Sequence, residues 1–104
     1  AQLVLTLAHA IAVAHQAGLS VGWAYLDQCL GQHLRGELTT FDASTAKLWC
    51  TEMHGRVVDA CVQLHGGYGF MREYEICRLY ADARVQRIYG GTSEIMRELI
   101  ARNL

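Results

Sequence analysis

Two adjacent glycines followed by two hydroxyl residues form the segment of this sequence best suited to chemistry. They are Gly90 and Gly91, followed by Thr92 and Ser93 and then by an apolar helical pattern that begins at Ile95. Glycine lets a backbone approach another group closely, and a threonine or serine hydroxyl can cap a new helix. The free N–H groups and positive dipole end of that helix suit an anion, such as a phosphate or a carbonyl oxygen gaining charge. The pattern predicts an anion site; a turn followed by an ordinary capped helix is the alternative.

The composition limits the fold and the classes of function. The chain has 104 residues, of which 52% are hydrophobic and 18% charged, and its formal net charge is −1. This length suits one domain with a modest core, and the apolar fraction argues against disorder. It also suggests that other subunits, or a missing part of a larger protein, cover some apolar surface. The charge gives no electrostatic case for nucleic-acid binding.

The cysteines show no pattern typical of a metal site or a disulfide framework. They form no C-x-x-C pair and lie in apolar helical patterns at Cys29, Cys50, Cys61 and Cys77. We expect small buried thiols in a reducing compartment. Cys50 and His54 have the i, i+4 spacing of a ligand pair, but no second pair accompanies them, so no metal is predicted.

Residues 3–26 carry no Asp, Glu, Lys or Arg, which makes a transmembrane helix one interpretation of this stretch. The stretch contains histidine, glutamine and serine and is built more from alanine than from leucine. No basic flank precedes it, which also argues against a secretory signal. A helix buried on most sides within a bundle explains the same composition, and we predict that arrangement.

Apolar periodicity and glycine positions predict four helices joined by short connections. The first runs from about residue 3 to 36, and the second begins at Thr39, where Thr39-x-x-Asp42 resembles a capping box with aspartate as its acid. The third has about ten residues after a glycine-rich loop, and the fourth runs from the Gly-Gly-Thr-Ser segment to about residue 103. Because no segment alternates like a strand, the predicted fold class is an all-α antiparallel helical bundle.

The second predicted helix has an apolar stripe and a polar row at helical spacing. The stripe consists of Ala46, Trp49, Cys50, Met53, Val57, Cys61 and Leu64. The polar row consists of Glu52, Arg56, Asp59 and Gln63, which leaves Gln63 free to meet a ligand or another chain. Gly66 is expected to end this helix in a left-handed conformation, with an irregular loop to Phe70. The predicted buried side of the third helix is Ile76, Leu79, Tyr80 and Ala83.

Several separate motifs resemble the carboxy-terminal domain of acyl-CoA dehydrogenases in residue type, order and spacing. They are RVVDACVQLHGGYGFM at residues 56–71, Glu73-Tyr74, DARV at 82–85 and IYGGTSEI at 88–95. The likeness is close from about Trp23 to the last residue and poor before Leu19. It implies that residues 1–104 are this helical domain, incomplete at its N-terminal side. Family members add an amino-terminal helical domain and a middle β-domain.

The resemblance implies flavoenzyme chemistry. In the family a carboxylate removes the α-proton of an acyl-CoA thioester while FAD takes the β-hydride, which gives the trans-2-enoyl product. An electron-transfer flavoprotein then accepts the electrons. Members usually assemble as homo-oligomers, either dimers or tetramers built from dimers, and the location implied is cytoplasmic, or the mitochondrial matrix in a eukaryote.

The resemblance also implies roles for two segments of this chain. The Q-x-x-G-G turn, which lies against the FAD of a neighbouring subunit, corresponds to Gln63, Leu64, His65, Gly66 and Gly67. The residues near the FAD phosphates correspond to Thr92, Ser93 and Glu94. The positions beside the bound thioester correspond to Gly90 and Gly91.

The main departure from the family pattern lies at Gly90, where many members carry their catalytic glutamate in Y-E-G-T. Glycine cannot accept a proton. Members of the long-chain and isovaleryl branches have Gly or Ala there and hold the carboxylate on an earlier helix, which here would precede Ala1. The upstream acids Glu37, Glu52, Glu73 and Glu75 do not fall at that position, so no catalytic residue is assigned and the isolated chain is expected to be inactive.

Two other classes of function stay open on the sequence alone. One is a non-catalytic helical oligomerisation or interaction module derived from the family, which the high apolar content would also suit. The other is a membrane-anchored helical subunit, which rests only on the uncharged first segment.

Overall fold

The computed structural model describes the backbone of residues 2–104 and the side chains of residues 15–104. The helices are α1 (Gln2–Leu34), α2 (Thr40–His65), α3 (Glu75–Val85) and α4 (Ser93–Arg102), with a short 3₁₀ helix, η1 (Gly66–Phe70), after α2. No strand occurs within the described residues. The predicted all-α bundle of four helices is therefore confirmed.

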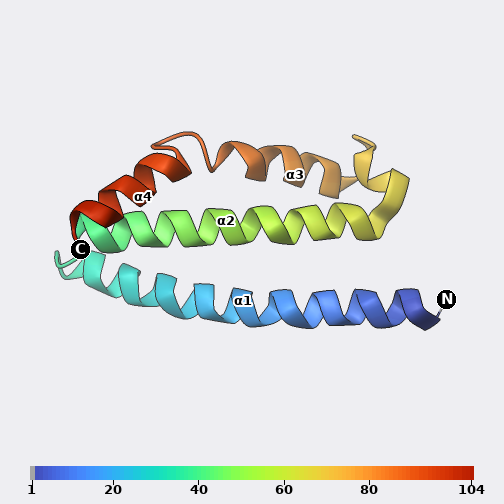
Figure 1. Ribbon diagram of the computed structural model, residues 1–104, viewed down its shortest axis with the longest axis horizontal. Coiled ribbons are helices and arrows are strands. Elements are labelled where there is room, and N and C mark those ends of the chain that lie inside the picture. Colours follow the sequence, from blue (N-terminus) through green and yellow to red (C-terminus); the bar gives the residue numbers. More distant parts are fainter. Residues whose placement is uncertain (1) are drawn as a thin grey trace.

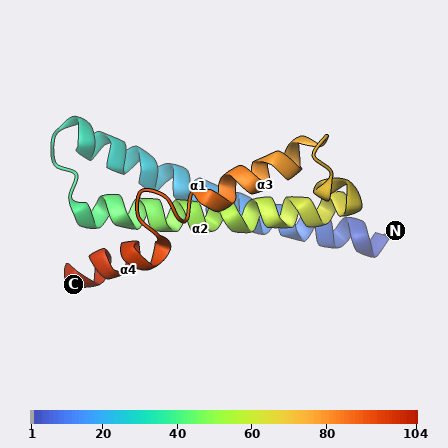
Figure 2. The ribbon, with the colours of Figure 1, turned by 90° about the horizontal axis from the view of Figure 1, so that it is seen from above.

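Helix α2 is the centre of the molecule. In Figure 1, α1 runs antiparallel to α2 along one side, while α3 and α4 lie end to end along the other side. Seen from above, both α1 and the α3–α4 pair cross α2 obliquely (Figure 2). Each of the other elements therefore packs against α2, and the chain extends over 50 × 25 × 24 Å.

The start of α2 is fixed by its predicted cap. The Thr39 hydroxyl oxygen accepts a hydrogen bond from the Asp42 N–H at 3.1 Å and donates to the Asp42 carboxylate at 3.0 Å. The Tyr25 hydroxyl on α1 donates to the other carboxylate oxygen of Asp42 at 3.3 Å. Partial burial, followed by the neighbouring Cys29 and Asp42 groups, raises the pKa of Tyr25 to about 12. Thr39 thus caps α2, and Asp42 joins α2 to α1.

Glycines shape the other end of α2. Gly66 ends the helix with φ +62° and ψ −141°, so its positive φ is as predicted, but its ψ is not that of a left-handed helix. Only glycine adopts this region readily. The expected irregular loop is instead the 3₁₀ helix η1. Its buried Gly69 lies close to α2, because a Cβ at this position would be only 2.6 Å from the Val62 carbonyl oxygen. The missing side chain lets η1 fold back onto α2.

The buried core consists of small and medium side chains: Cys29, Ala46, Val58, Ala83 and Met96. Ala46 and Ala83 confirm part of the predicted stripes. The predicted burial of Leu64, Leu79 and Tyr80 is wrong, since these side chains are 40–50% exposed. Ala83 is the buried residue of α3, whereas the larger apolar side chains Leu79 and Tyr80 stay partly open to solvent. All four cysteines are free, but only Cys29 is fully buried.

The uncharged first stretch forms most of α1, as predicted. The prediction that this helix is buried on most sides is wrong for the part whose side chains are described, since Leu19, Trp23 and Leu26 are 41–69% exposed. Side chains of residues 3–14, which make up half of that stretch, lie outside the described part. Among the described residues, no helix combines the length and apolarity needed to cross a bilayer. In the same residues, no group of three His, Cys, Asp or Glu side chains is arranged to hold a metal ion.

Candidate functional site

The two segments singled out by the sequence lie at different places along α2. Lys47 of α2 contacts Gly91 in the loop between α3 and α4, whereas Gln63 lies near the other end of α2. Sixteen residues separate Lys47 from Gln63, which corresponds to about 24 Å of helix. In Figure 1 the α3–α4 loop and η1 likewise lie at different places along α2. The chain alone does not bring these two segments together.

The start of α4 has the geometry expected of a capped helix. Thr92 is the N-cap residue, and its hydroxyl oxygen accepts a hydrogen bond from the Ile95 N–H at 3.2 Å. The preceding loop is closed by the Ser93 N–H, which donates to the Arg87 carbonyl oxygen at 3.1 Å. Thr92 is half-buried and Glu94 is exposed, so both lie where the helix start meets solvent.

The two glycines before α4 have different surroundings. Gly90 has φ +64° and Gly91 has φ +113°, and both values favour glycine. A Cβ on Gly91 would overlap the methyl group of Met96, whereas a Cβ on Gly90 would meet no atom within 4 Å. Gly91 therefore packs inward and Gly90 borders open space.

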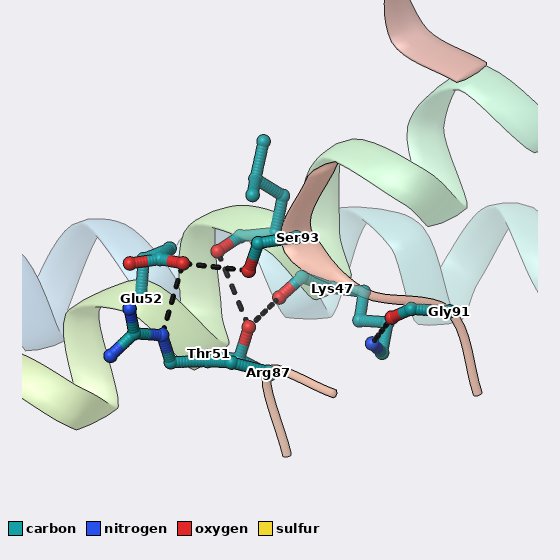
Figure 3. Close-up of polar contacts among 7 residues, drawn as sticks. Lys47, Thr51, Glu52, Arg87, Gly91 and Ser93 are labelled. Carbon is teal, nitrogen blue, oxygen red and sulfur yellow. Dashed lines mark hydrogen bonds and ion pairs between the residues drawn. The ribbon is translucent and has the colours of Figure 1, made fainter. Parts of the chain in front are cut away.

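A half-buried carboxylate of α2 holds this loop in place. The Ser93 hydroxyl donates to Oε1 of Glu52 at 2.6 Å, and Nε of Arg87 donates to the same oxygen at 3.1 Å (Figure 3). The hydrogen bond from Ser93, reinforced by the charge of Arg87, lowers the pKa of Glu52 despite its partial burial. Ser93 itself is only 5% exposed. Its hydroxyl thus donates to Glu52 and does not face the open side of the loop.

Glu52 belongs to the predicted polar row of α2, but it is less exposed than the other members of that row. Arg56, Asp59 and Gln63 of that row are exposed, but the Glu52 side chain is only 20% exposed. The i, i+4 spacing of Glu52 and Arg56 favours a surface pair, yet Glu52 pairs with Arg87, 35 residues later. A contact at that separation leaves no local signal in the sequence.

Lys47 supplies a second tie between α2 and the loop. Its ammonium group donates to the Gly91 carbonyl oxygen, and its side chain is half-buried (Figure 3). Lys47 and Glu52 are five residues apart on one helix, so a single rigid element holds both ends of the Gly91–Ser93 segment. Lys47 was not predicted from the sequence to be a site residue.

A small hollow of about 80 Å³ opens at the start of α4. It is lined by Arg84, Arg87, Ile88, Thr92, Ser93 and Glu94. Two guanidinium groups beside a helix N-terminus suit an anionic oxygen. Its volume suits one phosphate-sized group rather than a whole nucleotide. Arg84 lies in a motif that the sequence analysis noted, but neither arginine was assigned a role there.

The other predicted segment is open surface. Gln63, Leu64, His65, Gly66 and Gly67 are all exposed, and a Cβ on either glycine would meet no atom within 4 Å. The His65 ring donates from Nδ1 to the Cys61 carbonyl oxygen at 2.8 Å, which holds the ring along the helix end. The side chain of Gln63 is exposed, as predicted.

An apolar cavity of about 280 Å³ lies between α1 and α2. It is lined by Leu19, Gly22, Trp23, Leu26, Cys50, Thr51, Met53, His54, Val57 and Gln86. Nδ1 of His54 forms a hydrogen bond with Oε1 of Gln86 at 3.1 Å. Cys50 and His54, which have the i, i+4 spacing of a ligand pair, thus both line an apolar cavity. The cavity contains none of the predicted site residues.

Comparisons with known proteins agree with this architecture. Residues 5–104 match the family described as "Acyl-CoA dehydrogenase, C-terminal domain". The likeness thus reaches well before Trp23, where the motif resemblance began, so the expectation of poor likeness before Leu19 was wrong.

Three relatives illustrate the match. The chain is 48% identical over 104 residues to the mitochondrial long-chain specific acyl-CoA dehydrogenase of Rattus norvegicus, covering 95% of this chain and 24% of that protein. The corresponding enzyme of Sus scrofa is 49% identical over 104 residues, with the same coverage. A crystal structure of an acyl-CoA dehydrogenase from Geobacillus kaustophilus superposes with a TM-score of 0.82 at 43% identity, covering 85% of this chain and 23% of that chain.

The chain therefore spans about a quarter of the length of the curated relatives it matches, as the 24% coverage shows. The matched quarter coincides with their helical C-terminal part, and the four-helix fold around α2 superposes on a solved member. By sequence and by fold, this chain belongs to the acyl-CoA dehydrogenase C-terminal domain family.

Proposed function

We propose that this chain serves as the C-terminal helical domain of an FAD-dependent acyl-CoA dehydrogenase, which oxidises an acyl-CoA thioester to the trans-2-enoyl-CoA. The match of residues 5–104 to that domain carries the proposal. FAD would supply the acceptor for the β-hydride. The residues of this chain would bind and orient, and other parts of the enzyme would complete the site.

The start of α4 is the segment we assign to the flavin phosphates. The hollow there presents Arg84 and Arg87 beside the Thr92 cap, and this donor set fits one phosphate group of the flavin diphosphate. Thr92 and Glu94 face the open side, whereas Ser93 supports the helix start from within through Glu52. Gly90 and Gly91 would present their backbone to the thioester.

The Gln63–Gly67 segment would contact the FAD of a neighbouring subunit. Its exposure and its distance of about 24 Å along α2 from the Lys47–Gly91 contact support this assignment. The proposal therefore requires a homo-oligomer, either a dimer or a tetramer of dimers.

The carboxylate base would come from another part of the enzyme. Gly90 carries no side chain that could take a proton. Glu52 touches the same loop, but its lowered pKa and its hydrogen bonds to Ser93 and Arg87 make it a poor base. Acyl-CoA as substrate, an electron-transfer flavoprotein as electron acceptor, and a location in the cytoplasm or the mitochondrial matrix belong to the same proposal.

A chimaera tests this function directly. This chain would replace the matching segment of the rat long-chain enzyme, where 48% identity favours correct packing. We expect the purified chimaera to retain FAD and to lose flavin absorbance on addition of a long-chain acyl-CoA. A folded chimaera that binds no flavin would contradict the proposal.

A titration of the 104-residue chain with FAD and an acyl-CoA tests the division of roles. We expect neither flavin binding in the micromolar range nor bleaching by substrate. Micromolar flavin binding together with bleaching by substrate would show that the chain alone carries a complete site.

A second candidate is a helical interaction module without chemistry. Large apolar side chains on the surface favour it, including Trp23 at 69% and Phe70 at 86% exposure. Sedimentation of the purified chain discriminates, because a stable monomer would count against any retained role in oligomerisation.

A further inference from the structure

We propose that Glu52 and Lys47 are positioning residues, which clamp the Arg87–Ser93 loop to α2 so that the start of α4 and the Gly90–Gly91 backbone face outward in one conformation. This inference rests on the proposed function for its use. The clamp itself is a property of this chain and can be tested without flavin.

The loop needs an external constraint because of its own sequence. Two consecutive glycines at positive φ lose more conformational entropy on ordering than any other pair of residues. The closure within the loop itself comes from the backbone, through the bond from the Ser93 N–H to the Arg87 carbonyl oxygen. Side chains from outside the loop must supply further order.

The two α2 residues supply that order at three points. Glu52 accepts from the Arg87 guanidinium at the start of the loop and from the Ser93 hydroxyl at its end. Lys47 donates to the Gly91 carbonyl oxygen between them. Since both bonds to Glu52 end on an ionised oxygen, they are of the stronger, charge-assisted kind. The three contacts leave Gly90 as the residue that borders open space.

The geometry separates this role from general stability. Glu52 and Lys47, both on α2, touch one loop and the first residue of α4. Their loss should therefore loosen the Arg87–Ser93 loop while the contacts of α1 with α2 stay intact. A residue important only for overall stability would affect every helix alike.

Amide hydrogen exchange of the 104-residue chain, measured by NMR, tests the inference. Glu52→Ala should lower the protection factor of the Ser93 amide about tenfold, as expected for lost hydrogen bonds to a charged group. The amide of Val62, farther along α2, should change less than about twofold. Glu52→Gln should restore most of the protection, because its side-chain oxygen can still accept from Ser93 and Arg87. Lys47→Met, which keeps the aliphatic stem, should loosen the loop to a smaller extent.

Asp59→Ala is the matched control, since Asp59 is an exposed carboxylate on the same helix. Unchanged protection of Ser93 in Glu52→Ala would overturn the inference, and so would an equal loss of protection in all helices. If Glu52→Ala fails to fold, Lys47→Met decides in the same way. If Glu52→Ala leaves the Ser93 protection factor unchanged and the chimaera binds flavin, only this inference is refuted. If Glu52→Ala lowers the protection factor as expected and the chimaera binds no flavin, only the proposed function is refuted.

Discussion

The two glycine-containing segments of this domain are held in place by different means. The Gly66–Phe70 segment is fixed by backbone packing, because Gly69 lies directly on Val62, and the residues before it are open to solvent. The Arg87–Ser93 loop is fixed by side chains of α2, through Glu52 and Lys47. The segment next to the exposed surface that we propose meets another subunit is held by packing alone, whereas the loop that we propose presents its backbone is held by a side-chain clamp.

The largest effect should come from Gly69→Ala. Its Cβ would lie 2.6 Å from the Val62 carbonyl oxygen, and neither η1 nor α2 can yield without breaking backbone contacts. We expect a loss of about 3 kcal/mol in the free energy of unfolding, measured in urea. Gly67→Ala, where the new methyl group meets no atom within 4 Å, is the control. Equal stability of the two variants would show that η1 is not held by this contact.

A smaller effect should follow from removing the cap of α4. Thr92→Ala loses the hydrogen bond from the Ile95 N–H, and we expect a cost of about 1 kcal/mol in unfolding free energy. Thr39→Ala removes the equivalent cap of α2 and provides the comparison. If Thr92→Ala left stability and the amide protection of Ile95 unchanged, the side-chain cap would not define the start of α4.

The smallest effect should be a pH dependence of the unfolding free energy that comes from Glu52. The pKa of Glu52 is lowered in the folded chain, so its ionised form stabilises the fold above its ordinary pKa near 4.5. This contribution is lost as the pH falls through the lowered value. The stability gap between the wild type and Glu52→Gln should therefore be wider at pH 7 than at pH 3. A gap of constant size would mean that the charge of Glu52 contributes nothing.

Local features of the sequence predicted the helices well. The Thr39 and Thr92 caps and the helix-ending Gly66 act within a few residues, so their patterns identify the ends of α2 and the start of α4. The periodicity of α2 also identified the exposed Gln63. These contacts depend only on neighbours in the chain.

The clamp and the burial of α3 could not be predicted in this way. Glu52 meets Ser93 41 residues later, and Lys47 meets Gly91 44 residues later, so both contacts arise only when the loop returns to α2. Leu79 was predicted to be buried from periodicity, but a stripe shows only that a face is apolar. It does not show whether the residues that pack against this face come from the same chain.

The central claim is that the two segments of one chain serve two different flavin sites, and a mixing experiment tests it most directly. One chimaera would carry Gln63→Ala with His65→Ala, and a second would carry Thr92→Ala with Glu94→Ala. Each alone should lose most of its bound FAD, because every site lacks one segment. Co-expression should restore about a quarter of the sites, since half of randomly mixed dimers hold one site with both segments intact. Recovery of FAD binding on mixing would support the account, and mixed oligomers that stay free of flavin would contradict it.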